Sequence, residues 1–238
     1  MGEHDDHRQR VYARALREGM AGFEEHNALE MLLFYCHPRM DTNALAHRLI
    51  ARFGSFAGVL DAPLEELADV KGMGPVTASK VKLLPEICAY YQNSRFADIK
   101  VLDSVHLAVQ YCAPKFFGKT QEMLLMVSLD DKRRVLRCTP LSNGSTNATA
   151  VSVPQVVGEA IKTHATGVLL AHNHPRGLAA PSPDDIRATM EVYKALNLVN
   201  IKLVDHLIFA DDEHLSMAGA GYLQNIKESL QVQPYGQI

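Results

Sequence analysis

The sequence predicts an α+β fold (α/β in the broad sense) in two parts, an all-helical domain over residues 1–95 and a mixed β-sheet domain flanked by helices over residues 96–238. Two observations support this division. The first ninety or so residues show helical periodicity and almost no strand pattern, whereas strand and helix patterns alternate further on. The polar residues 92–95 (Gln-Asn-Ser-Arg) between the two regions have the composition of a linker.

Helices account for most of the first part. Apolar residues recur at i, i+3, i+4 and i+7 in residues 29–36, which predicts one buried helix face. Residues 41–43 (Asp-Thr-Asn) offer N-caps for a helix that ends near residue 54, and residues 63–67 begin a short helix. A longer helix is expected over residues 76–91.

Residues 70–78 (Val-Lys-Gly-Met-Gly-Pro-Val-Thr-Ala) match the turn of a helix-hairpin-helix. Gly72 and Gly74 permit a tight hairpin whose backbone amides can face a phosphate, and Lys80 and Lys82 add positive charge. We therefore expect weak, salt-dependent DNA binding through residues 70–82. The alternative is that the hairpin only packs helices together. Residues 1–95 hold 11 Lys and Arg against 13 Asp and Glu, whereas dedicated nucleic-acid binders show a basic face.

The second part alternates helices with strands. Helices are predicted over residues 104–111, 156–164 and 182–196, strands over 122–129, 134–139, 167–174 and 201–209, and a polar loop over 142–149.

Composition excludes several classes of protein. The polar residues 1–10 are not a signal peptide, and no apolar run is long enough to span a bilayer, so we expect no membrane association. The four cysteines are scattered and form no Cys-x-x-Cys pair, which is typical of reduced thiols in a cytoplasmic protein. A net charge of −3 is not that of a protein built to coat a polyanion.

His172, His174 and Asp185 form a candidate metal site. The two histidines lie two residues apart on a predicted strand, so their imidazoles point to the same side. Asp185 follows on the first turn of the next helix, and two imidazoles with one carboxylate leave a fourth position for water, as in catalytic zinc sites. Iron or manganese would also suit this ligand set.

Two alternatives remain open for the carboxylate. Asp184 lies one residue away on the same helix and competes as a ligand. Ser182, Pro183 and Asp185 also resemble a helix N-cap with a capping box, which would give Asp185 a purely structural role.

The pattern His-x-His, seven residues, Ser, two residues, Asp resembles the signature of JAMM (MPN+) metalloproteases and is complete here. Together with His-Asn-His-Pro at 172–175 and Val-Asp-His-Leu-Ile at 204–208, it resembles the RadC family. The resemblance implies a helix-hairpin-helix domain followed by a JAMM domain with cytidine deaminase-like layering. It also implies that His172, His174 and Asp185 hold Zn²⁺ and that Ser182 stabilises an oxyanion.

The resemblance further implies an upstream glutamate that acts as general base. Glu122, at the start of an early strand, fits this place best, and Glu159 is the alternative. Asp205 and His206 could orient a ligand histidine, but we favour a hydrogen-bonded core pair. Arg176 stands where the family usually has Ser, which changes the charge at the mouth of the cleft and puts substrate preference in question.

The expected function is amide-bond hydrolysis of an unidentified peptide or protein substrate by a zinc metallopeptidase-like enzyme. The alternative of a different class is a DNA-binding accessory protein in DNA repair or recombination, with a structural or vestigial metal site. A third reading is hydrolysis of a non-peptide amide, because similar sites serve several kinds of amide bond.

Overall fold

The computed structural model describes residues 3–38, 40–143, 152–175 and 177–231. The chain divides into two compact units, Met1–Cys88 and Ala89–Ile238, and the division falls within helix α6 (Gly74–Arg95). The predicted linker at residues 92–95 is wrong, because these residues form the last turn of α6. Their polar side chains bond to nearby carbonyls instead of favouring a loop: Asn93 donates to Ala89 O at 2.8 Å, and Ser94 donates to Tyr91 O at 2.7 Å. The domain boundary at residue 95 stays a prediction.

The first unit is helical, as predicted. Its helices are α1 (Glu3–Glu18), α2 (Glu25–Cys36), α3 (Asn43–Phe53), α4 (Phe56–Asp61), α5 (Leu64–Ala68) and the first part of α6. Leu29 and Leu33 of α2 pack with Leu45 and Leu49 of α3 in a core that excludes water almost completely. The predicted apolar face of residues 29–36 is therefore confirmed.

A glycine hairpin joins α5 to α6. Gly72 and Gly74 have φ values of +98° and +62°, a region that residues with a side chain rarely adopt. Lys82 Nζ donates to Leu60 O at 2.6 Å, near the end of α4, so this lysine supports the fold of the unit. Lys80, in contrast, is exposed.

The second unit is built on a five-stranded sheet with the order β2-β1-β3-β4-β5. Its strands are β1 (Met123–Leu129), β2 (Val135–Asn143), β3 (Gly167–Asn173), β4 (Lys202–Ala210) and β5 (Glu213–Ser216). β3 and β4 are parallel, and the other neighbours are antiparallel. The sequence did not predict β5 or the last helix, α10 (Tyr222–Gln231).

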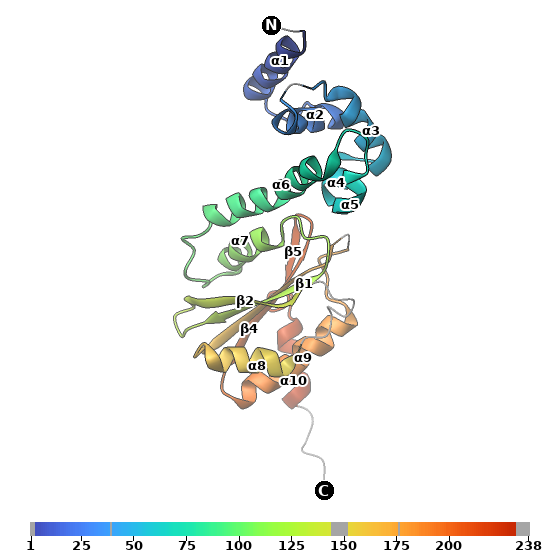
Figure 1. The fold of residues 1–238 in the computed structure, drawn as a ribbon. Coiled ribbons are helices and arrows are strands. Elements are labelled where there is room, and N and C mark those ends of the chain that lie inside the picture. The colour runs from blue at the N-terminus through green and yellow to red at the C-terminus, as the bar shows by residue number, and fades with distance from the viewer. Residues whose placement is uncertain (1–2, 39, 144–151, 176, 232–238) are drawn as a thin grey trace. The chain divides into compact units, whose positions relative to one another are not determined.

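Helices cover both faces of this sheet (Figure 1), with α7 (Val105–Phe116) on one and α8 (Val153–Lys162) and α9 (Pro183–Leu198) on the other. Alternating residues of β1 point to opposite faces of the sheet. Leu125 and Val127 pack with α7 on one face, and Leu124 and Met126 pack with α8 and α9 on the other. The α+β class and the layering of helix, sheet and helix agree with a JAB/MPN-like domain.

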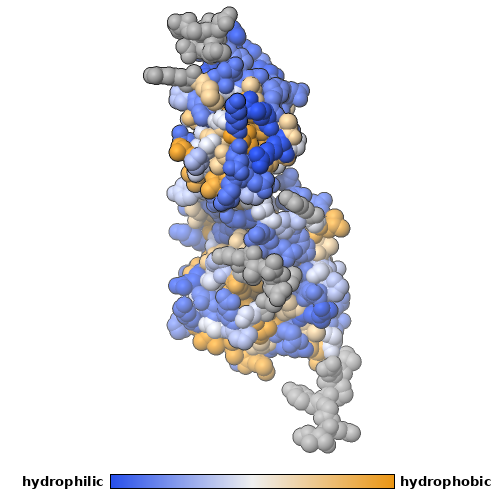
Figure 2. Space-filling view, turned by 45° about the vertical axis from the view of Figure 1, so that its right-hand side comes forward, coloured by the Kyte–Doolittle hydropathy of each residue, from blue (hydrophilic) through white to orange (hydrophobic). Residues whose placement is uncertain are grey.

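The surface carries hydrophobic side chains in small groups among hydrophilic ones on the face that Figure 2 draws. Among the residues that the structure describes, none of the helices has the length and apolar character needed to cross a membrane. Arg176 and most of the predicted loop at residues 142–149 lie outside the described residues.

Candidate metal centre

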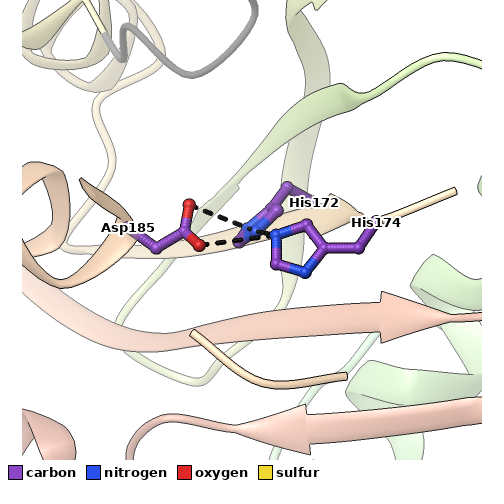
Figure 3. A group of neighbouring side chains, drawn as sticks. All are labelled: His172, His174 and Asp185. Carbon is purple, nitrogen blue, oxygen red and sulfur yellow. Dashed lines mark hydrogen bonds and ion pairs between the residues drawn. The ribbon is translucent and has the colours of Figure 1, made fainter. Parts of the chain in front are cut away.

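The carboxyl end of β3 carries the two histidines. Every residue of β3 is buried, and antiparallel β1 and parallel β4 hold the strand on its two sides. His172 lies within the strand, and the backbone N–H of His174 donates to Phe209 O of β4 at 2.7 Å. The alternation along the strand directs both imidazoles to the side of the sheet that α9 covers (Figure 3).

Asp185 lies in the first turn of α9, where it completes a capping box with Ser182. The Ser182 N–H and hydroxyl donate to Asp185 Oδ2 at 2.8 and 2.6 Å, and the Asp185 N–H donates to Ser182 Oγ at 3.1 Å. The capping arrangement is therefore confirmed, but it does not exclude Asp185 from the metal site. The carboxylate is buried and belongs both to the cap and to the cluster with the two histidines.

The donor atoms of His172, His174 and Asp185 all lie within 4.8 Å of one another. The two Nε2 atoms are 2.8 Å apart, and each is 3.4 Å from a different carboxylate oxygen (Figure 3). No other group of at least three such residues occurs in the described parts of the chain.

Hydrogen bonding shows which nitrogen of His174 faces this cluster as an acceptor. His174 Nδ1 lies 2.9 Å from the carbonyl oxygen of Leu178, which can only accept, so Nδ1 carries a proton. In the neutral ring Nε2 is then a free lone pair directed at His172 and Asp185. A carbonyl partner of this kind is typical of metal-binding histidines.

The electrostatics of the carboxylate favour its ionised form. Burial acts to raise the pKa of Asp185, but the adjacent imidazole of His172 and the hydrogen bonds from Ser182 outweigh it and hold the pKa far below its usual range. An ionised carboxylate together with two imidazole nitrogens is a donor set that fits Zn²⁺.

Glu122 lies outside the three-residue group, and the register of the neighbouring strands relates it to His174. Glu122 precedes β1 directly and is half-buried. Leu124 pairs with His172 in the antiparallel register, so Glu122, two residues earlier, comes level with His174 on the same face. Asn173 fixes this segment, because its side chain accepts from Met123 N at 2.8 Å and donates to Gln121 O at 3.2 Å.

The two competing carboxylates lie elsewhere. The side chain of Asp184 is 59% exposed and pairs with Arg187 instead of the histidines. Glu159 of α8 pairs with Arg137 and Lys162, and Thr139 donates to it at 3.3 Å. Neither belongs to the three-residue group.

Asp205 and His206 are both buried and share a hydrogen bond through the His206 backbone N–H, as a core pair would, but their side chains have separate partners. Asp205 accepts from the backbone N–H of His206 and of Ala218 and from the Ser216 hydroxyl, which anchors the turn after β5. His206 Nε2 instead lies 2.8 Å from Nδ1 of His172.

Thr189 was not recognised in the sequence. Its hydroxyl lies 2.7 Å from His206 Nδ1. The signal was its position four residues after Asp185, which places both on one face of α9. Burial, with the nearby His172, lowers the pKa of His206 well below its ordinary value.

Comparison with known proteins agrees with this geometry. Residues 102–222 match the family model described as a RadC-like JAB domain, the JAMM type of fold. The chain is also similar to UPF0758 protein SPO0054 of Ruegeria pomeroyi, with 32% identity over 218 residues, which cover 92% of this chain and 97% of that protein. The matched residues include β1, β3 and the start of α9, and therefore all the proposed site residues.

Proposed function

Because the chain belongs to the RadC family, we propose that it is a zinc-dependent hydrolase of the metallopeptidase type that cleaves amide bonds. The observation that carries the proposal is the convergence of His172, His174 and Asp185, whose donor atoms lie within 4.8 Å of one another. Three such ligands leave a position for water and substrate, as catalytic zinc sites require. The side chain of His174 is 16% exposed, so the cluster is not sealed from solvent.

Each residue has a defined task in this proposal. His172, His174 and Asp185 would hold Zn²⁺, which would supply a Lewis acid toward water and the substrate carbonyl. Glu122 takes a proton from the attacking water and returns it to the leaving amine. Its place level with His174 supports this role.

Ser182 is proposed to donate a hydrogen bond to the oxyanion. Its hydroxyl proton points to Asp185 Oδ2 in this structure, so the role requires the hydroxyl to turn toward the substrate. The backbone N–H of Ser182 would keep the helix cap meanwhile, since it donates to the same oxygen.

The proposed substrate is a peptide or protein, and a non-peptide amide is the other candidate of this chemistry. We propose a cytoplasmic location, which the four free cysteines support.

The test is a cleavage screen that combines zinc-loaded protein with a peptide library in ¹⁸O-labelled water. Hydrolysis introduces ¹⁸O at new carboxyl termini, which mass spectrometry detects. We expect Glu122→Gln to keep its zinc and to lose about 100-fold or more of the wild-type rate, the usual contribution of a general base. Glu159→Gln is the matched control and should cleave like the wild type. Equal cleavage by Glu122→Gln and the wild type would remove Glu122 from the mechanism.

A second candidate function is DNA binding through residues 70–82, as in an accessory protein of DNA repair or recombination. The support is the hairpin before α6, where Gly72 and Gly74 have positive φ values and the helix begins directly at Gly74. Such a turn exposes backbone amides to a phosphate. Only one of the two lysines stays available for DNA, since Lys82 bonds to Leu60 O. The two functions are compatible if the first unit brings the hydrolase to DNA-bound substrates.

A further inference from the structure

A continuous chain of hydrogen bonds links the imidazole of His172 to the backbone of Asp185. His172 Nδ1 lies 2.8 Å from His206 Nε2, and His206 Nδ1 lies 2.7 Å from Thr189 Oγ1. Thr189 Oγ1 in turn lies 2.5 Å from the carbonyl oxygen of Asp185. His206 and Thr189 are 1% and 0% exposed, so water does not replace either partner.

One arrangement of the protons in this chain leaves a lone pair on His172 for a metal. The carbonyl oxygen of Asp185 only accepts, so the Thr189 hydroxyl donates its single proton there. The sulfur of Met217, 3.7 Å from that hydroxyl, is a much weaker acceptor. Because its proton is committed, the Thr189 oxygen accepts from His206 Nδ1.

The hydrogen bond between His206 and His172 fixes the proton of His172 in turn. Because His206 Nδ1 donates to Thr189, the other nitrogen of a neutral His206 ring carries no proton. His206 Nε2 is therefore unprotonated and accepts from His172 Nδ1. This leaves His172 Nε2 as a lone pair. The Nε2 atoms of His172 and His174, 2.8 Å apart, then both face Asp185 without a proton between them, an arrangement that a bound cation would stabilise.

From this geometry we propose that His206 and Thr189 are positioning residues, which hold His172 in the tautomer that a metal requires. A neutral histidine can carry its proton on either nitrogen, and a proton on Nε2 would occupy the site of the metal. The chain ends on the backbone of Asp185, so one network orients ligands from both β3 and α9. The inference rests on the proposed metal site and names residues outside its ligand set.

The test uses the full chain and substitutions of Thr189. Thr189→Val keeps a similar shape but removes the only acceptor for the His206 Nδ1 proton. His206 is then expected to carry its proton on Nε2 and donate to His172 Nδ1, which forces the His172 proton onto Nε2. Thr189→Ser keeps the hydroxyl and is the matched control. Thr189→Ala, which adds no methyl to the buried site, replaces Thr189→Val if the valine variant does not unfold cooperatively.

Two measurements read out the result. Long-range ¹H–¹⁵N correlation spectra of the metal-free protein report the tautomer of His172, and competition with a chelator reports zinc affinity. We expect an Nδ1 proton in the wild type and in Thr189→Ser, and an Nε2 proton in Thr189→Val. Zinc affinity should fall by about 10–100-fold in Thr189→Val, the usual effect of losing such a partner, and stay close to wild type in Thr189→Ser.

The outcomes separate this proposal from the proposed function. If the tautomer of His172 is unchanged in the variant without the hydroxyl, His206 and Thr189 do not control it and the proposal is overturned. This holds even if zinc affinity falls, because altered packing alone would then explain the loss of affinity. Failure of the wild type to bind zinc contradicts the proposed function instead. The spectra of the metal-free protein still show whether His206 and Thr189 set the tautomer of His172.

Discussion

Asp185 shows how one side chain serves both the fold and the site. Its Oδ2 accepts two hydrogen bonds that close the N-terminus of α9, while both oxygens face the histidines. A helix N-terminus favours a negative charge, so the cap and the ligand role require the same ionised carboxylate. The capping role and the proposed ligand role of Asp185 are therefore compatible.

The pH dependence of stability tests the charge of Asp185. Because its pKa is lowered in the folded protein, the ionised carboxylate contributes stability that is present above the ordinary carboxyl range, about pH 4, and is lost as the pH falls further. We expect Asp185→Asn to destabilise the metal-free protein by about 1.5–3 kcal/mol at pH 7, the range for hydrogen bonds to a charged group. Denaturant unfolding at several pH values measures the difference, which should shrink below about pH 4. A difference that stays constant with pH would contradict the low pKa.

At the scale of elements, the junction of β1 and β3 positions the proposed general base. The Asn173 side chain bonds to the backbone on both sides of Glu122, at Gln121 O and Met123 N. Asn173 is buried, so water does not readily replace these bonds. The segment that carries Glu122 is thus tied to the strand that carries the ligands.

Substitution of Asn173 should loosen this segment. We expect Asn173→Ala to speed the hydrogen exchange of the Met123 amide and to leave zinc affinity close to wild type, because the hydrogen bonds of its side chain go to Met123 N and Gln121 O. The loss of the two hydrogen bonds should cost about 1–3 kcal/mol in stability. Asn93→Ala, which removes a partly buried side chain that bonds to Ala89 O and Pro114 O, is the control and should not change Met123 exchange. Unchanged exchange at Met123 in Asn173→Ala would show that the segment is held by other contacts.

Much of this element-scale organisation could be predicted from the sequence. Local periodicity predicted that the i, i+2 histidines at the end of an apolar strand would meet a carboxylate at the start of the next helix, and the family resemblance then favoured Asp185 over Asp184. The hydrogen-bond chain through Thr189 and His206 could not be found in this way. It depends on how α9 packs against β4 and how β4 pairs with β3, and these elements are neighbours only in three dimensions. The linker at 92–95 was wrong because composition does not show that a helix can satisfy polar side chains with its own carbonyls.

At the scale of the whole molecule, two compact units with different structural character lie on one chain, with the division inside α6. The hydrolase residues all belong to the second unit, and the hairpin belongs to the first. The DNA-binding proposal and the hydrolase proposal can therefore be tested separately in the full chain.

The hairpin proposal predicts weak DNA binding that falls steeply with salt, because phosphate contacts release counterions. Lys80→Ala should weaken the binding of a fluorescent duplex and lower the slope of log K against log salt by about 1. Lys202→Ala, an exposed lysine of the second unit, is the control and should bind like the wild type. The absence of any anisotropy change at low salt, with duplex or branched DNA, would remove DNA binding.

The metal content of the purified protein tests the central claim most directly. Elemental analysis should find about one zinc per chain in the wild type, as three converging ligands predict. The same analysis should find none in His172→Ala/His174→Ala. A control that also removes two histidines, His106→Ala/His214→Ala at exposed positions, should keep the metal. No zinc in the wild type, even after zinc is added back, would contradict the hydrolase and leave DNA or protein binding as the better explanation.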